Sequence, residues 1–185
     1  MVEDAYWKIV RKLLFSNGIE GVIAGPKAIE IHLRDLSIPD ILIVYTTDTN
    51  AVWNISDRHK VVVKTAKTGE KTGRGNAYSV FRKMSETVEV GGVRLRVAGI
   101  EHALLDALIT HKGIAKASGE HSVKKAVSKY SKTVDREKLG KLVSCKYLTA
   151  VNRLRTIARD SGKTDLYEKT LEVVKFEGGN CFVSS

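Results

Sequence analysis

Along the first two thirds of the chain, segments whose apolar residues have helical spacing are interspersed with segments whose apolar residues have strand spacing. A helical spacing comes first and predicts a helix over residues 4–16, ended by Asn17-Gly18. A second helix is expected over 27–35, because Pro26 suits a first helical turn. Apolar runs with strand spacing predict strands over the following ranges: 19–24, 40–45, 51–55, 60–66 and 78–83.

The pattern then contains a hairpin signal and changes to helical spacing. Residues 87–97 alternate around Gly91-Gly92, a pair suited to a tight hairpin turn. After Gly99, helical spacing predicts a helix that ends near Gly113, with Asp135 and Asp165 as N-caps of later helices. The later elements expected are helices over 119–131, 135–144, 147–160 and 165–174, and a small hairpin over 175–183 around Gly178-Gly179.

These elements predict an α/β (α+β) fold in two parts. The first part, residues 1–112, is expected to form a mixed sheet with flanking helices. The second part, residues 113–185, is expected to form a helical C-terminal lobe. No apolar run approaches the roughly 20 residues that span a bilayer, and no secretory leader is evident. We therefore expect a cytoplasmic protein that does not enter membranes.

Charge composition favours an acidic partner. The chain of 185 residues has 31 basic and 21 acidic residues and a net charge of +10. The absence of Gln and the many charges are typical of a thermophile, but thermophile proteins usually match Lys with Glu. The excess of basic residues therefore favours DNA, RNA or an acidic protein surface. Cys145 and Cys181 are expected to be reduced thiols.

Two groups of basic residues could contact phosphates, although a solvated surface is the alternative for each. Few aromatic residues interleave with them, so a platform for stacked bases is not indicated. The helical lobe contributes Lys124, Lys125, Lys129, Lys132, Arg136, Lys138 and Lys141. The group that we predict to bind nucleic acid or a partner comprises Arg58, Lys60, Lys64, Lys67, Lys71 and Arg74, along one strand and a polar loop. Arg82 and Lys83 accompany this group on the return strand.

One segment has the order of elements found in nucleotidyltransferases. A strand, the turn Gly25-Pro26-Lys27, a helix and a strand opened by Asp40 follow one another, and this order resembles the frame of that fold. There the Gly turn faces a triphosphate, and an Asp-x-Asp pair holds Mg²⁺. Leu42 occupies the position of the second carboxylate. We interpret Gly25, Lys27 and Asp40 as a vestigial nucleotide site, with no catalytic residue, metal or cofactor.

The alternative is an active Mg²⁺-dependent nucleotidyltransferase with unrecognised ligands. Glu30, Asp35 and Asp48 are the nearest spare acids, and Glu89 is the only acid in the later strands. The alternation around Glu89 predicts that it faces solvent. Residues 69–75 lack the order of a phosphate-binding loop, and the histidines and cysteines lack the spacing of metal ligands.

Three stretches resemble the antitoxin domain of AbiEi-type proteins, which belong to type IV toxin–antitoxin systems. They are residues 25–32, 38–44 and 92–108, followed by a helical tail whose Arg153-Leu154-Arg155 resembles the Arg-Leu pair of that family. The resemblance implies a non-enzymatic pseudoenzyme that counteracts a nucleotidyltransferase toxin. One helix precedes the domain where that family usually has a DNA-binding winged helix. A nucleic-acid-binding protein of a mobile genetic element is a further hypothesis.

The helix after Gly99 carries part of this resemblance, and it also has a purely structural interpretation. Its apolar residues form one stripe, which predicts a core-facing side. Glu101 and Asp106 fall outside that stripe. We therefore expect both carboxylates to lie outside the core.

Overall fold

A six-stranded mixed sheet forms the centre of the N-terminal part of the protein. The computed structural model describes residues 3–66, 77–109 and 116–177. The sheet order is β3-β4-β2-β1-β6-β5; β1 runs antiparallel to β2 and parallel to β6, and β2 runs parallel to β4. The strands are β1 (Val22–Ala24), β2 (Ile41–Thr46), β3 (Ala51–Asn54), β4 (Lys60–Thr65), β5 (Ser85–Val90) and β6 (Val93–Ala98).

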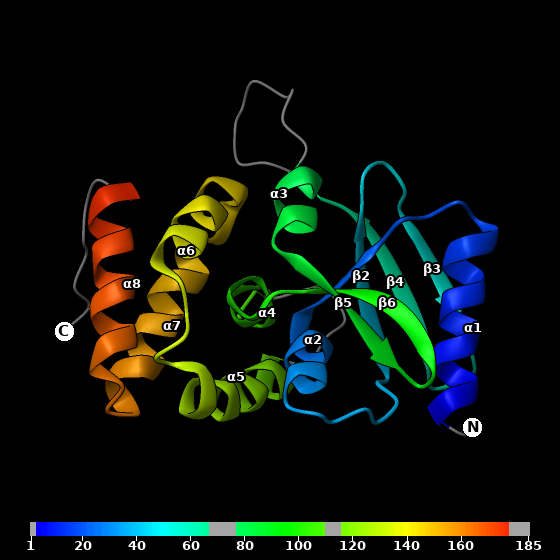
Figure 1. The fold of residues 1–185 in the computed structure, drawn as a ribbon, viewed down its shortest axis with the longest axis horizontal. Coiled ribbons are helices and arrows are strands. Elements are labelled where there is room, and N and C mark those ends of the chain that lie inside the picture. The colour runs from blue at the N-terminus through cyan, green and yellow to red at the C-terminus, as the bar shows by residue number, and fades with distance from the viewer. Residues whose placement is uncertain (1–2, 67–76, 110–115, 178–185) are drawn as a thin grey trace.

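Helices cover both faces of the sheet and form the C-terminal region, as the sequence predicts. Figure 1 shows α1 on one side of the sheet, α2 and α4 on the other, and α5 to α8 beyond them. The helices are α1 (Glu3–Ser16), α2 (Gly25–His32), α3 (Tyr78–Lys83), α4 (Ile100–Ala107), α5 (Lys116–Tyr130), α6 (Arg136–Leu142), α7 (Leu148–Asp160) and α8 (Thr164–Glu177), with a π-helical turn, η1, at Val143–Tyr147.

β2 lies inside the sheet and is buried on both faces. Successive side chains of a strand point to opposite faces, so Leu42 and Val44 share one face and Ile43 and Tyr45 share the other. All four are buried, which explains the continuous apolar run in the sequence. The register pairs Ala24 of β1 with Ile43, and this pairing places the start of α2 beside the start of β2.

The hairpin and one helix start agree with the sequence. Gly91 and Gly92 both have positive φ, +55° and +72°, as the primed hairpin turn between β5 and β6 requires. A Cβ atom on Gly91 would also lie 2.7 Å from Cδ1 of Trp7 on α1. Asp135 caps α6, where its side chain accepts from the backbone N–H groups of Glu137 and Lys138 at 2.8 and 3.4 Å.

Some expected elements are wrong. Residues 78–83 form helix α3 and not a strand, because the buried residues Tyr78 and Phe81 are three positions apart, on one side of a helix. Lys175–Glu177 belongs to α8 and does not begin a hairpin; Gly178-Gly179 lies outside the described residues. Asp165 lies in the first turn of α8, which begins at Thr164.

Helix α4 is buried on nearly every side, which contradicts the expected position of its carboxylates. Glu101 and Asp106 are 2 % and 0 % exposed. α4 packs on α2 and the sheet on one side and on α5, α6 and α7 on the other. One cluster of buried apolar residues therefore extends from the sheet through α4 into α6, α7 and α8. Among the described helices, none is long and apolar enough to cross a membrane.

Candidate functional site

The Gly turn and the start of β2 lie side by side. Gly25, the first residue of α2, has a φ of +67°, which favours glycine. A Cβ atom there would lie 3.0 Å from Cδ1 of Ile43 and 3.5 Å from Oδ2 of Asp106. The glycine thus permits close approach of α2 to both β2 and α4, so packing alone accounts for its presence.

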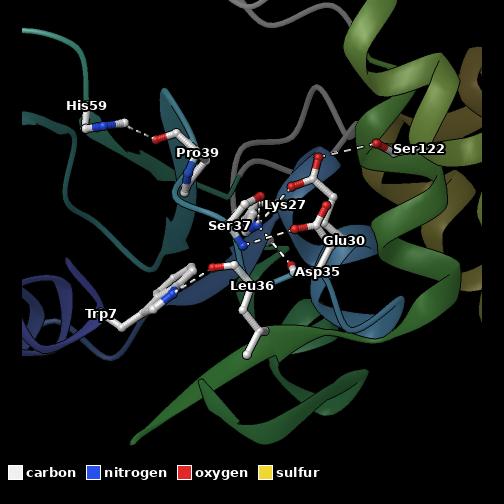
Figure 2. Close-up of polar contacts among 9 residues, drawn as sticks. All are labelled: Trp7, Lys27, Glu30, Asp35, Leu36, Ser37, Pro39, His59 and Ser122. Atoms are coloured by element: carbon white, nitrogen blue, oxygen red, sulfur yellow. Dashed lines mark hydrogen bonds and ion pairs between the residues drawn. The ribbon is translucent and has the colours of Figure 1, made fainter. Parts of the chain in front are cut away.

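Lys27 is buried and its ammonium group is fully used within the protein. The side chain is 2 % exposed, and Nζ lies 3.0 Å from Oε2 of Glu30, 3.0 Å from the backbone O of Asp35 and 3.4 Å from Oγ of Ser37. Figure 2 shows Lys27 pointing to the connection between α2 and β2. An ammonium group has three hydrogens to donate, so no donor of Lys27 remains for a phosphate.

Two further side chains hold the same connection, residues 33–40, from the far side of the sheet. Nε1 of Trp7 on α1 donates to the backbone O of Leu36 at 3.3 Å. Nδ1 of His59, just before β4, donates to the backbone O of Pro39 at 3.0 Å (Figure 2). Lys27, Trp7 and His59 together position the segment that leads to Asp40.

Asp40 lies at the surface and its carboxylate faces basic residues. Its side chain is 58 % exposed, and Oδ1 lies 2.7 Å from Nε of Arg58 and 3.9 Å from Nδ1 of His59. Leu42 is completely buried, on the face of β2 opposite Ile43. A carboxylate at position 42 would thus enter an apolar core, where burying its charge would be costly.

The spare acids have other contacts. Glu30 binds Lys27, and hydrogen bonds from the side chain and the N–H of Ser37 lower the pKa of Asp35. Asp48 accepts from the hydroxyl of Thr49 at 3.1 Å, and Glu89 is exposed as predicted. Within residues 3–66, 77–109 and 116–177, no three His, Cys, Asp or Glu side chains are arranged to hold a metal ion.

The described residues of the predicted basic group differ in position and exposure along β4. Lys60 and Lys64 point to the same face, about 13 Å apart at the ordinary rise per residue. Lys60 and Arg58 are exposed, whereas Lys64 is partly buried, and burial lowers its pKa while the charge of Asp106 opposes that shift. Lys67, Lys71 and Arg74 lie outside the described residues.

A buried polar cluster that the sequence did not reveal links the sheet to the helical region. Oδ1 of Asp106 accepts from the hydroxyls of Tyr45 at 2.8 Å and Tyr147 at 2.7 Å. Nε2 of His102 lies 3.0 Å from the Tyr147 hydroxyl and donates to it. Burial, followed by the charge of Asp106, raises the pKa of both tyrosines. A hollow of about 220 Å³ opens beside Tyr45, Tyr147 and Lys64.

Two larger hollows also lie outside the sites predicted from the sequence. One of about 920 Å³ lies where the start of β1, the end of β2, α3 and β6 meet, and it contains Arg82 and Arg96. Another of about 560 Å³ lies between α6 and α8, beside the exposed ring of Phe176. The sequence signal for the first hollow is the pair Arg82-Lys83, which the apolar spacing places on a strand and the structure places on α3.

Comparison of the chain with protein-family models, with curated proteins and with solved structures finds no match. The fold class is therefore defined by the sheet order and the layers of helices alone. The functional argument rests on the contacts of Lys27, Asp40, Leu42 and the charged side chains of the surface.

Proposed function

We propose that this chain is a non-enzymatic, antitoxin-like protein that counteracts a nucleotidyltransferase toxin in the cytoplasm. It has a nucleotidyltransferase-like arrangement of β1, α2 and β2 and uses it as a binding scaffold. The protein is a pseudoenzyme in this proposal and needs no metal or cofactor.

The contacts of Lys27 are the observation that carries this proposal. A lysine at the third position of a phosphate-facing helix would have to direct its ammonium group outward to bind a nucleotide. Lys27 instead donates to three oxygen atoms of its own chain. Leu42 supports the same conclusion, because its position in the core leaves Asp40 without a second carboxylate on β2.

The segments that resemble AbiEi-type antitoxins meet around α4. Residues 25–32 form α2, and residues 92–108 run through β6 and α4. Arg153 of α7 donates to the backbone O of Leu108, and Leu154 is completely buried. The stretches that carry the resemblance therefore pack into one unit, as a single antitoxin-like binding scaffold requires.

Nucleotide transfer provides the test. Purified protein is incubated with Mg²⁺ or Mn²⁺, each of the four labelled nucleoside triphosphates, and total tRNA as acceptor. We expect no transfer above the level of a protein-free control. Transfer that requires Asp40, and is lost in Asp40→Ala but retained in Asp48→Ala, would establish the active-enzyme alternative and contradict the proposal.

We propose binding of DNA or RNA as a second candidate function, favoured by the net charge of +10. Binding through the predicted basic group should weaken steeply with salt, because neutralised phosphates release counterions. Neutralising Arg58, Lys60, Lys64 and Lys67 together should then lower the affinity for an oligonucleotide. Affinity that does not change with salt would contradict this second function.

A further inference from the structure

We infer that the hollow between β1, β2, α3 and β6 binds the phosphate backbone of a single-stranded nucleic acid. The inference rests on the second candidate function above. It assigns that function to Arg82 and Lys83, which the sequence places on the strand next to the predicted basic group, and to Arg96, which belongs to neither basic group predicted from the sequence.

Two arginines from different elements converge at one point in this hollow. Nη2 of Arg82 on α3 lies 2.8 Å from Oε1 of Glu20, and Nη2 of Arg96 on β6 lies 3.8 Å from the same oxygen atom. Two guanidinium groups that share one anionic oxygen also fit a phosphate, because their planar N–H groups match its oxygen atoms. The Glu20 carboxylate thus occupies the place where a phosphate oxygen would bind.

Hydrogen bonds that do not involve the Glu20 carboxylate hold the walls of the hollow. Nη1 of Arg96 donates to Oγ of Ser85 at 3.3 Å, and this hydroxyl donates to the backbone O of Arg82 at 2.7 Å. The Tyr78 hydroxyl donates to the backbone O of Glu20. The side chain of Glu20 is 55 % exposed, so it can turn into solvent while both arginines and its own backbone stay in place.

The shape favours a single strand over a duplex. The hollow has a volume of about 920 Å³, and Arg96 is more buried than Arg82, with 30 % against 51 % of the side chain exposed. A duplex is too wide and too stiff to enter a hollow of this size, whereas a single strand can bend into a basic groove. Lys83 lines the hollow on the same helix and adds a third positive charge.

Fluorescence anisotropy with a labelled 20-nucleotide single-stranded RNA, its DNA equivalent and the matching duplex tests this inference on the full chain. The double variant Arg82→Ala/Arg96→Ala is compared with Arg136→Ala/Lys141→Ala, which removes the same charge from α6. We expect the first variant to bind single strands about tenfold more weakly, with a salt slope smaller by about 1 to 2. The α6 variant should stay within about twofold of the unchanged protein, the spread expected for charges outside the contact.

A second pair of variants tests the role of Glu20 without removing any arginine. Glu20→Gln releases Arg82 and Arg96, whereas Glu172→Gln releases Arg136 from an equally short and equally exposed ion pair of 2.7 Å. Both changes add one positive charge to the net charge. We expect Glu20→Gln to raise the affinity about threefold or more, and Glu172→Gln to raise it less than twofold, because only the former frees phosphate-binding groups.

The possible failures are distinguishable. No binding of any oligonucleotide by the unchanged protein would contradict the second candidate function, and the inference with it. Binding that is equal in the Arg82/Arg96 and Arg136/Lys141 variants, or equal gains in Glu20→Gln and Glu172→Gln, would overturn the inference alone. Binding of a polyglutamate peptide in place of oligonucleotides, lost in Arg82→Ala/Arg96→Ala, would assign the hollow to an acidic protein and overturn it as well.

Discussion

The ammonium group of Lys27 donates to the backbone carbonyl of Asp35 at 3.0 Å, and this bond ties α2 to the connection that precedes β2. Glu30 and Ser37 accept from the same nitrogen. A basic residue at a position suited to a phosphate therefore acts as a structural link.

Replacing Lys27 should lower stability and leave surface binding unchanged. Lys27→Met removes three hydrogen bonds, so we expect the free energy of unfolding to fall by about 2 kcal/mol, measured by urea denaturation. Lys60→Met, at an exposed position on the same side of the sheet, is the control and should change it by less than about 0.5 kcal/mol. Unchanged stability in Lys27→Met would show that these bonds contribute little.

Asp106 should be among the most sensitive polar positions in the protein. Asp106→Asn weakens two charge-assisted bonds from Tyr45 and Tyr147, so we expect a loss of about 2–3 kcal/mol in the free energy of unfolding. Asp48→Asn changes an exposed carboxylate and serves as the matched control. If both variants unfolded at the same urea concentration as the unchanged protein, the cluster would not link the sheet to the helices as we describe.

His102 should make the protein less stable in mild acid. Burial lowers the pKa of His102 to about 4, from 6.5 in the unfolded chain. The unfolded state therefore binds a proton first as the pH falls below 6.5, and stability should fall by about 3 kcal/mol down to pH 4. His102→Gln should lose less stability between pH 7 and 4.5 than the unchanged protein. His121→Gln changes a histidine on the exposed side of α5, and this control should lose as much stability as the unchanged protein. Identical pH profiles of stability for all three proteins would contradict the role assigned to His102.

Tyr6 should tolerate loss of its hydroxyl. The side chain is completely buried, and the hydroxyl has no hydrogen-bond partner among the described residues. Burial raises the pKa of this hydroxyl. Tyr6→Phe should therefore leave the free energy of unfolding unchanged or raise it by about 1 kcal/mol, whereas Tyr147→Phe should lower it by about the same amount. Thermal unfolding of the two variants, measured side by side, tests this prediction. A clear loss of stability in Tyr6→Phe would contradict it.

Local sequence signals predicted the parts of the fold that depend on neighbouring residues. The central strand β2 was evident from its apolar run, the β5–β6 hairpin from Gly91-Gly92, and the start of α6 from Asp135. The hairpin pairing and the Asp135 cap lie within a few residues of their signals. The run in β2 is evident because both faces of that strand are buried, although its partners β1 and β4 lie further away in the chain. Helix α3 was mistaken for a strand because six residues are too few to distinguish the two apolar spacings.

The polar cluster and the arginine pair could not be predicted in the same way. Tyr45 and Tyr147 lie 61 and 41 residues from Asp106 in the chain, so no local pattern joins them. The apolar stripe around Asp106 is typical of a helix with one solvent-exposed side, whereas α4 is packed on both sides. Arg82 and Arg96 meet only because α3 and β6 place them around Glu20.

The central claim is that this chain counteracts a nucleotidyltransferase toxin, and bacterial growth tests it most directly. We predict that a gene beside this one encodes a nucleotidyltransferase that arrests growth when it is expressed by itself, and this chain is co-expressed with that enzyme. We predict that growth recovers, and that it also recovers with Asp40→Ala, because no catalytic chemistry at Asp40 is needed. Growth that stays arrested with the unchanged chain, at equal expression of both proteins, would contradict the account.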